Sequence, residues 1–78
     1  MKRITICLDN IKKVQGFQLA IKNLHCLLEL ESGSCSVNAR SQLGVFTLNL
    51  SEPLELVLDD DSSFQEVYHA VKPYIISR

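Results

Sequence analysis

An alternating stretch decides how the fold begins: Arg3-Ile4-Thr5-Ile6-Cys7-Leu8. Ile4, Ile6 and Leu8 fall on one side of an extended chain, and β-branched side chains are frequent, so the stretch predicts a half-buried strand. Beyond it the apolar residues recur at steps of three and four instead of two. This spacing predicts an amphipathic helix over residues 13–24, whose apolar stripe consists of Val14, Phe17, Ala20, Ile21 and Leu24.

Three further segments have the period of two that is typical of strands. They span residues 27–31, 35–38 and 54–58, and a turn at residues 32–34 joins the first two. Gly33 favours that turn, because glycine adopts a positive φ without steric cost. The pattern therefore predicts a hairpin and, later in the chain, a fourth strand.

Residues 41–50 fit a helical stripe as well as strand alternation. We favour a short helix, because Ser41 is a good N-cap and Pro53 soon ends the segment. The last helix follows the acidic residues 59–61. It is predicted to begin at a capping box formed by Ser63 and Glu66.

The predicted order is β-α-β-β-α-β-α, and it defines the fold class. Pro73 should end the last helix, since proline lacks an N–H and clashes with the preceding turn. Because each strand has one apolar face and each helix one apolar stripe, we predict an α+β open-faced sandwich. Its four-stranded, mainly antiparallel sheet carries all three helices on one face, and the other face meets water. The whole chain, residues 1–78, forms one domain.

Composition is that of an ordinary globular protein and gives no function by itself. Of the 78 residues, 46% are hydrophobic and 22% are charged, which argues against a disordered chain. The net charge of −1 removes the bulk electrostatic argument for nucleic acid or an anionic membrane as the main partner. Positive charge prevails over residues 1–40 and negative charge over residues 41–78.

The three cysteines, Cys7, Cys26 and Cys35, have no C-x-x-C spacing and suggest no zinc site. No stretch has the length of a membrane span, and the N-terminal residues do not have the pattern of a signal peptide. We therefore expect free thiols, a cytoplasmic location, and neither metal nor other cofactor.

One motif stands out: Val37-Asn38-Ala39-Arg40-Ser41-Gln42-Leu43-Gly44-Val45. Together with the element order, it resembles the HPr family, the small phosphocarriers of the bacterial sugar phosphotransferase system. Members carry a similar Val-Asn-x-Lys/Arg-Ser-x-x-Gly stretch between the third strand and the short second helix. The resemblance implies an HPr-like domain over residues 1–78.

The resemblance also implies two functional positions. One is a histidine at the start of the first helix, within a Gly-Ile/Leu-His-Ala-Arg-Pro run, which accepts phosphate from enzyme I. That run is absent here: Gln15 stands at the histidine position and Phe17 at the arginine position, or Asn10 at the histidine position if the alignment is ungapped. The other is a regulatory serine that an ATP-dependent kinase phosphorylates in many Gram-positive bacteria, and Ser41 falls on it.

The family includes the Crh type of bacilli, which has glutamine for histidine and keeps the serine. By resemblance we expect a non-enzymatic regulatory or protein-binding module without histidine phosphocarrier activity, switched by phosphorylation of Ser41. Expected partners are phosphotransferase-system proteins, HPr kinase or a transcription regulator, and neither nucleic acid nor a membrane. The residues expected to contact partners are Arg40, Leu43, Gln15 and Phe17.

Several alternatives stay open. Ser41 can be only an N-cap, and the spacing of Phe17 also fits a core position. The protein can be a working phosphocarrier whose acceptor is relocated to His25, near the end of the first helix, or His69, within the last one; structural roles are the simpler reading of both. A generic split-βαβ interaction or nucleic-acid-binding domain is a third possibility, but the outward strand positions lack the aromatic side chains that stack on bases.

Overall fold

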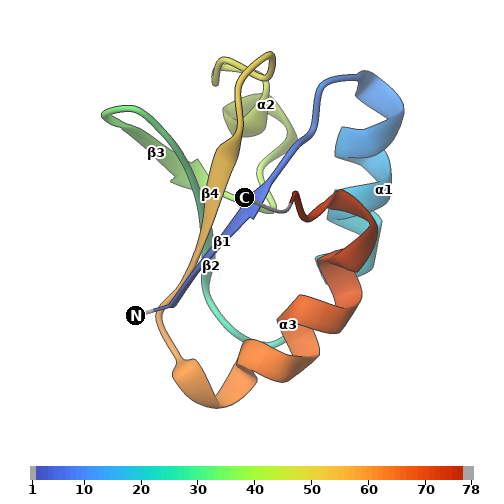
Figure 1. Ribbon diagram of the computed structural model, residues 1–78, viewed down its shortest axis with the longest axis vertical. Helices are drawn as coiled ribbons and strands as arrows, with labels where there is room; N and C mark the ends of the chain where they lie inside the picture. Colours follow the sequence, from blue (N-terminus) through green and yellow to red (C-terminus); the bar gives the residue numbers. More distant parts are fainter. Residues whose placement is uncertain (1, 77–78) are drawn as a thin grey trace.

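The computed structural model describes residues 2–76, and its elements follow the predicted order. The strands are β1 (Lys2–Ile6), β2 (Leu28–Ser32), β3 (Cys35–Asn38) and β4 (Leu54–Leu58), and the helices are α1 (Ile11–Ile21), α2 (Gln42–Val45) and α3 (Phe64–Val71). Two 3-10 turns, η1 (Asp61–Ser63) and η2 (Lys72–Tyr74), flank α3. The protein is therefore of the α+β class, with a four-stranded open sheet (Figure 1).

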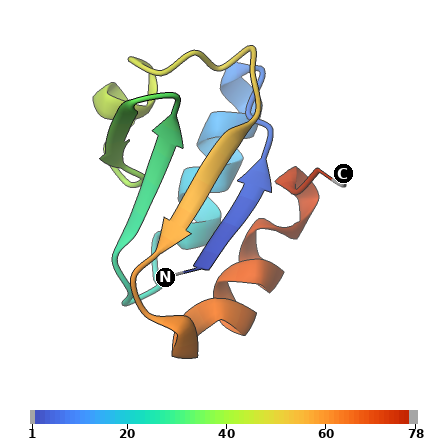
Figure 2. The same cartoon turned by 60° about the vertical axis from the view of Figure 1, so that its left-hand side comes forward.

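The sheet has the strand order β1-β4-β2-β3, and each neighbouring pair is antiparallel. Leu56 lies at its centre, opposite Ile4 on one side and Leu30 on the other. Helices α1 and α3 cover the same face of this sheet (Figures 1 and 2). The C-terminal segment pairs with the end of β1: Ile75 forms an antiparallel bridge with Ile6, and the Cys7 N–H donates to the carbonyl of Tyr74 at 2.9 Å.

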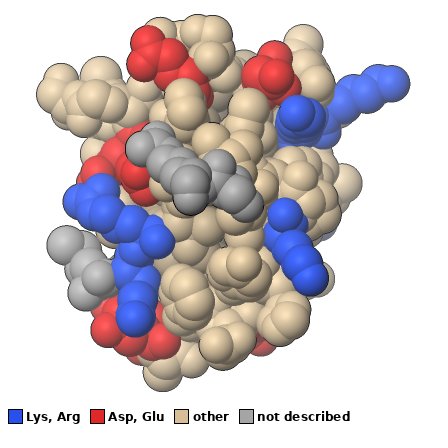
Figure 3. All heavy atoms as spheres, viewed as in Figure 1, with Lys and Arg blue, Asp and Glu red and all other residues tan. Residues whose placement is uncertain are grey.

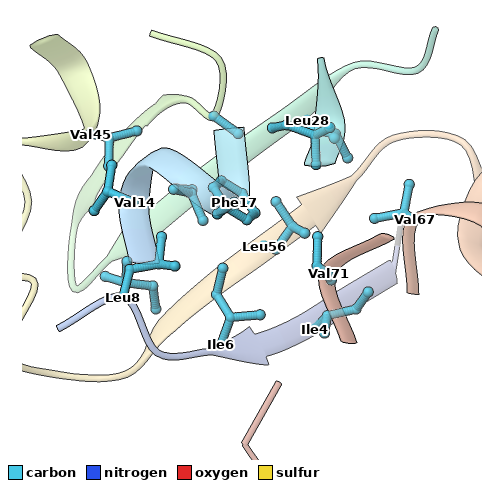
Figure 4. Packing of buried hydrophobic residues seen from close by; sticks show 14 of the residues in the cluster. Ile4, Ile6, Leu8, Val14, Phe17, Leu28, Val45, Leu56, Val67 and Val71 are labelled. Atoms are coloured by element: carbon cyan, nitrogen blue, oxygen red, sulfur yellow. The ribbon is translucent and has the colours of Figure 1, made fainter. Parts of the chain in front are cut away.

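The core lies between the sheet and these helices. The inward strand residues Ile4, Ile6, Leu28, Leu30, Leu54, Leu56 and Leu58 meet Val14, Phe17 and Ile21 from α1, Val45 from α2, and Val67 and Val71 from α3 (Figure 4). All are buried, and no polar or charged residue between Lys2 and Ile76 is. Burial of apolar surface stabilises the fold by about 25 cal/mol per Å², and it is the dominant force that holds the elements together.

The first helix begins earlier than its apolar spacing predicts. Asn10 is its N-cap: the side-chain Oδ1 accepts the N–H of Lys13 at 2.8 Å. Helix α1 therefore spans Ile11–Ile21 rather than residues 13–24. Val14, Phe17 and Ile21 of the predicted stripe are buried, which confirms the orientation of the helix if not its bounds.

The predicted capping box at the start of the last helix is wrong. Ser63 is the residue that precedes α3 in the N-cap position, but its side chain makes no cap hydrogen bond. The chain instead enters α3 through η1, where Asp60 accepts the N–H of Ser62 at 3.0 Å. Because Asp60 supplies a cap one turn earlier, Glu66 is not needed as a reciprocal partner. The end of α3 is as predicted, since the helix stops at Val71 and Pro73 lies in η2.

The second face of the sheet has no helix over it, yet it is not bare. Val57 points to this side from β4 and is only 4% exposed. Arg3 on β1 reaches across β4 to Glu31 on β2, with 2.5 Å between the guanidinium Nη1 and the carboxylate Oε1. The hydroxyl of Thr5 donates to Glu55 at 3.2 Å. These polar side chains cover the apolar centre of the open face.

Candidate functional site

Ser41 lies between β3 and α2 as the N-cap of a four-residue helix. Its Oγ accepts the N–H of Gly44 at 3.1 Å, and its residue is exposed. Gly44 suits this close approach: a Cβ added there would lie 3.0 Å from the Ser41 Oγ and 3.4 Å from the Val37 Cβ, so these neighbours would have to shift by a few tenths of an ångström. The Ser-x-x-Gly spacing of the motif thus has a local structural cause, and it leaves the hydroxyl at the surface.

Arg40 precedes Ser41, and its side chain reaches the end of α1. Its guanidinium donates to the carbonyls of Ile21 at 3.2 Å, Leu24 at 2.5 Å and Cys26 at 3.0 Å. These carbonyls belong to the end of α1 and the segment after it, where helix carbonyls lack intrahelical partners. Arg40 is therefore a long-range cap for α1. The sequence did not predict this role, because it depends on contacts between distant residues.

The entrance to α1 is occupied by Asn10, as the N-cap, and Gln15 lies in the second turn. Of the two alignments considered above, only the ungapped one puts a residue at the helix start. Neither side chain carries an imidazole. Gln15 is exposed, so it remains accessible to a partner.

Phe17 has the core position that its spacing also allowed. It is fully buried, and its ring meets the edge of Tyr74 with 6.2 Å between ring centroids. An accessible partner surface therefore contains Gln15 and Leu43, which are exposed, but not the side chain of Phe17. Leu43 is 83% exposed, as a residue in a docking surface must be.

Both histidines lie away from any helix start. His25 is exposed in the segment after α1, and not within that helix. His69 is exposed near the end of α3, with its ring 6.4 Å from that of Tyr68. A phosphohistidine at either position would lack the N–H donors of a helix N-terminus.

A shallow pocket of about 460 Å³ lies beside Ser41. Helix α1 supplies one wall, and Arg40 and Gln42, the two neighbours of Ser41, supply the other. Its lining residues are Gln15, Gln18, Leu19, Lys22, Arg40 and Gln42. The structure thus brings Gln15 of α1 close to Arg40 and Gln42, the two residues that flank Ser41. The sequence did not predict Gln18, Leu19, Lys22 and Gln42 as site residues. The helical spacing of Gln15, Gln18, Leu19 and Lys22 was a readable signal for the first three of them.

The two carboxylates with lowered pKa lie at chain turns outside this pocket. The pKa of Asp9 is held below its usual value by its hydrogen bond and ion pair with Lys13, at 3.0 Å. The pKa of Asp60 is lowered by the hydroxyl of Ser62 first and by the Ser62 N–H second. Both groups stabilise turns, and neither faces an imidazole or thiol across a site.

Between Lys2 and Ile76, no group of three or more His, Cys, Asp or Glu side chains is arranged to hold a metal ion. Within the same range, every helix is too short or too polar to cross a membrane.

Comparisons with known proteins add no assignment. No protein-family model matches the chain, and searches of the curated proteins and of the solved structures find no match to it. The site must therefore be interpreted from its own residues.

Proposed function

We propose that this chain is an HPr-like domain that has no histidine phosphocarrier chemistry and acts as a cytoplasmic regulatory, protein-binding module, switched by phosphorylation of Ser41. Its context would be the bacterial sugar phosphotransferase system. The observation that carries the proposal is the exposed Ser41 hydroxyl at the N-cap of α2, inside the motif that resembles the family.

The residues at the entrance to α1 support the proposed lack of carrier chemistry. The side-chain oxygen of Asn10 accepts the Lys13 N–H, and its amide does not gain or lose a proton near neutral pH. An amide nitrogen is a poor nucleophile because its lone pair is delocalised, and a covalent phosphoryl intermediate needs an activated nucleophile. Gln15 has the same limitation. The proposal therefore assigns no catalytic residue to the chain.

Phosphorylation of Ser41 would act by adding negative charge next to exposed apolar side chains. A phosphate adds almost two negative charges at neutral pH. Leu43, 83% exposed, lies two residues from Ser41, and Leu19, 69% exposed, lies in the adjacent pocket. Phosphorylation would place negative charge beside these exposed leucines. A partner that binds the leucines could therefore distinguish the phosphorylated chain from the unphosphorylated one. Arg40, which holds α1, and the exposed Gln15 complete the surface.

The test is treatment of the chain with HPr kinase and ATP, read by intact mass. We expect one phosphoryl group on the natural chain and none on Ser41→Ala. Ser63→Ala is the matched control, because Ser63 makes no side-chain cap hydrogen bond and its loss should leave the mass gain unchanged. An unmodified natural chain, or equal labelling of Ser41→Ala, would refute the switch.

The first alternative is a working phosphocarrier that uses His25 or His69. Incubation with enzyme I and phosphoenolpyruvate would then give an acid-labile mass gain that disappears in one of the two His→Ala variants. Neither position has the helix-start donors that stabilise a phosphate. We therefore expect no acid-labile product.

The second alternative, a nucleic-acid-binding domain, would use the open face of the sheet. Among residues 2–76, the strand positions on that face include three carboxylates, Glu29, Glu31 and Glu55, and one cation, Arg3. Figure 3 shows another side of the molecule, where acidic and basic side chains are interspersed rather than gathered by sign. Since nucleic acids are bound through clustered positive charge, neither surface favours this function.

A further inference from the structure

The pocket beside Ser41 has a chemical character of its own. Gln15, Gln18 and Leu19 of α1 and its C-cap residue Lys22 line one side, and Arg40 and Gln42 line the other. Two of the six lining residues are cationic, three are amides, one is apolar, and none is acidic.

The positive charge of this pocket is not neutralised locally. The ion pairs described between residues 2 and 76 are Arg3–Glu31 and Lys13–Asp9, and neither includes Lys22 or Arg40. Arg40 does compensate the carbonyl end of α1, but the helix dipole supplies only about half a negative charge there. The pocket therefore keeps a net positive potential.

The pocket also has donors that nothing else uses. Arg40 and Gln18 are committed, since Gln18 Nε2 donates to the carbonyl of Ala39 at 3.2 Å. The side chains of Lys22, Gln15 and Gln42 make no hydrogen bond or ion pair within residues 2–76. An ammonium and two amides that have no partner among the described residues thus line the same pocket.

Size and the apolar wall restrict the ligand further. A volume of about 460 Å³ lies within the range of small-molecule sites, roughly 300–1,000 Å³. Leu19 is 69% exposed and forms the apolar part of the lining. A bare inorganic anion would use the donors but leave Leu19 in water, whereas an organic anion would cover it.

We propose that this pocket binds a small organic anion, a carboxylate or phosphate attached to a compact apolar body. Lys22 and the amides of Gln15 and Gln42 hold the anionic group, Arg40 contributes a fixed positive charge, and Leu19 contacts the apolar part. This inference goes beyond the switch at Ser41 and needs no phosphorylation, so the two can fail separately.

The experiment is a titration of the unmodified chain with phenyl phosphate, benzoate and inorganic phosphate, followed by ¹H–¹⁵N correlation spectra. We expect saturable shifts, with millimolar affinity, at Gln15, Lys22 and Gln42 for one or both organic anions. Comparison of phenyl phosphate with benzoate identifies the preferred anionic group. Inorganic phosphate should bind more weakly; equal affinity would overturn the claim that the ligand is organic.

Matched variants test the residues. Lys22→Gln should weaken binding about fivefold or more, as the loss of one charge-assisted hydrogen bond implies. Lys12→Gln removes an exposed charge from the same helix outside the pocket and should leave the affinity unchanged. Leu19→Gln should weaken the organic anions but not inorganic phosphate. Shifts that fail to saturate, spread over all lysines, or are insensitive to Lys22→Gln would overturn the proposal.

Discussion

The guanidinium of Arg40 and the carbonyl oxygen of Leu24 lie 2.5 Å apart, across 16 residues of chain. This hydrogen bond, with those to Ile21 and Cys26, ties the segment before α2 to the end of α1. It fixes one wall of the pocket relative to the other. The main role of Arg40, the residue next to Ser41, is therefore structural.

Replacing Arg40 should destabilise the fold. Arg40→Ala leaves part-buried carbonyls without their donor, and we expect a loss of about 2 kcal/mol in the free energy of unfolding. Arg40→Lys should recover less than half of it, because one ammonium cannot reproduce the planar fork of a guanidinium. Urea denaturation followed by circular dichroism measures both. Equal stability of Arg40→Ala and the natural chain would contradict the capping role.

Gly16 and Tyr74 form a second long-range pair. A Cβ at Gly16 would lie 2.2 Å from the Tyr74 hydroxyl oxygen. Alanine normally favours a helix by about 1 kcal/mol over glycine, but here the clash should prevail, since the Tyr74 ring is packed against the buried Phe17. We expect Gly16→Ala to lower stability by about 1–3 kcal/mol, the usual cost of overpacking.

The Tyr74→Phe background is the control for that clash. It removes the hydroxyl and leaves the ring carbon Cζ, which is 3.4 Å from the added Cβ, an ordinary contact. Gly16→Ala made in this background should be neutral or stabilising by thermal denaturation. If it destabilises both backgrounds equally, the hydroxyl is not the cause.

The two N-caps should contribute separately to stability. Asn10→Ala and Ser41→Ala each remove one side-chain acceptor of a backbone N–H, and each should cost about 1 kcal/mol. Asn10→Asp should keep most of the cap, because a carboxylate also accepts the Lys13 N–H. Chemical denaturation of the variants measures the costs. Ser63→Ala, at a position that makes no cap bond, should change little.

Acid should weaken the turn at η1. The pKa of Asp60 lies below its ordinary value of 3.8 because the ionised carboxylate accepts the Ser62 hydroxyl and N–H. A lowered pKa in the folded state means stabilisation that is present above the ordinary pKa and is lost as pH falls through the lowered one. Ser62→Ala should raise the pKa of Asp60 toward 3.8, measured by carboxyl-carbon NMR titration. An unchanged pKa would show that the hydroxyl has no part in it.

Most of the architecture could be read from local patterns. Alternation and helical spacing identify the four strands and the two longer helices, since each pattern reflects which side of one element faces the core. The short helix α2 fits both periods and was predicted from Ser41 and Pro53 instead. Helix ends were harder: α1 begins at Asn10's cap and α3 enters through Asp60, because several polar residues near each end compete for the same N–H groups. The motif around Ser41 was recognisable because its bonds are local, as between Ser41 and Gly44.

The amino-acid order alone determined the element sequence, the buried stripes, the hairpin turn at Gly33 with its φ of 60°, and the absence of an imidazole at the first helix start. Only the tertiary structure decided that the Phe17 ring meets Tyr74, that Arg40 holds α1, and that Lys22 and Gln42 share a pocket. The physical reason is sequence separation. Periodicity reports one residue's relation to its near neighbours, whereas a pocket or a long-range cap exists only once the packing of the core has set where distant segments meet.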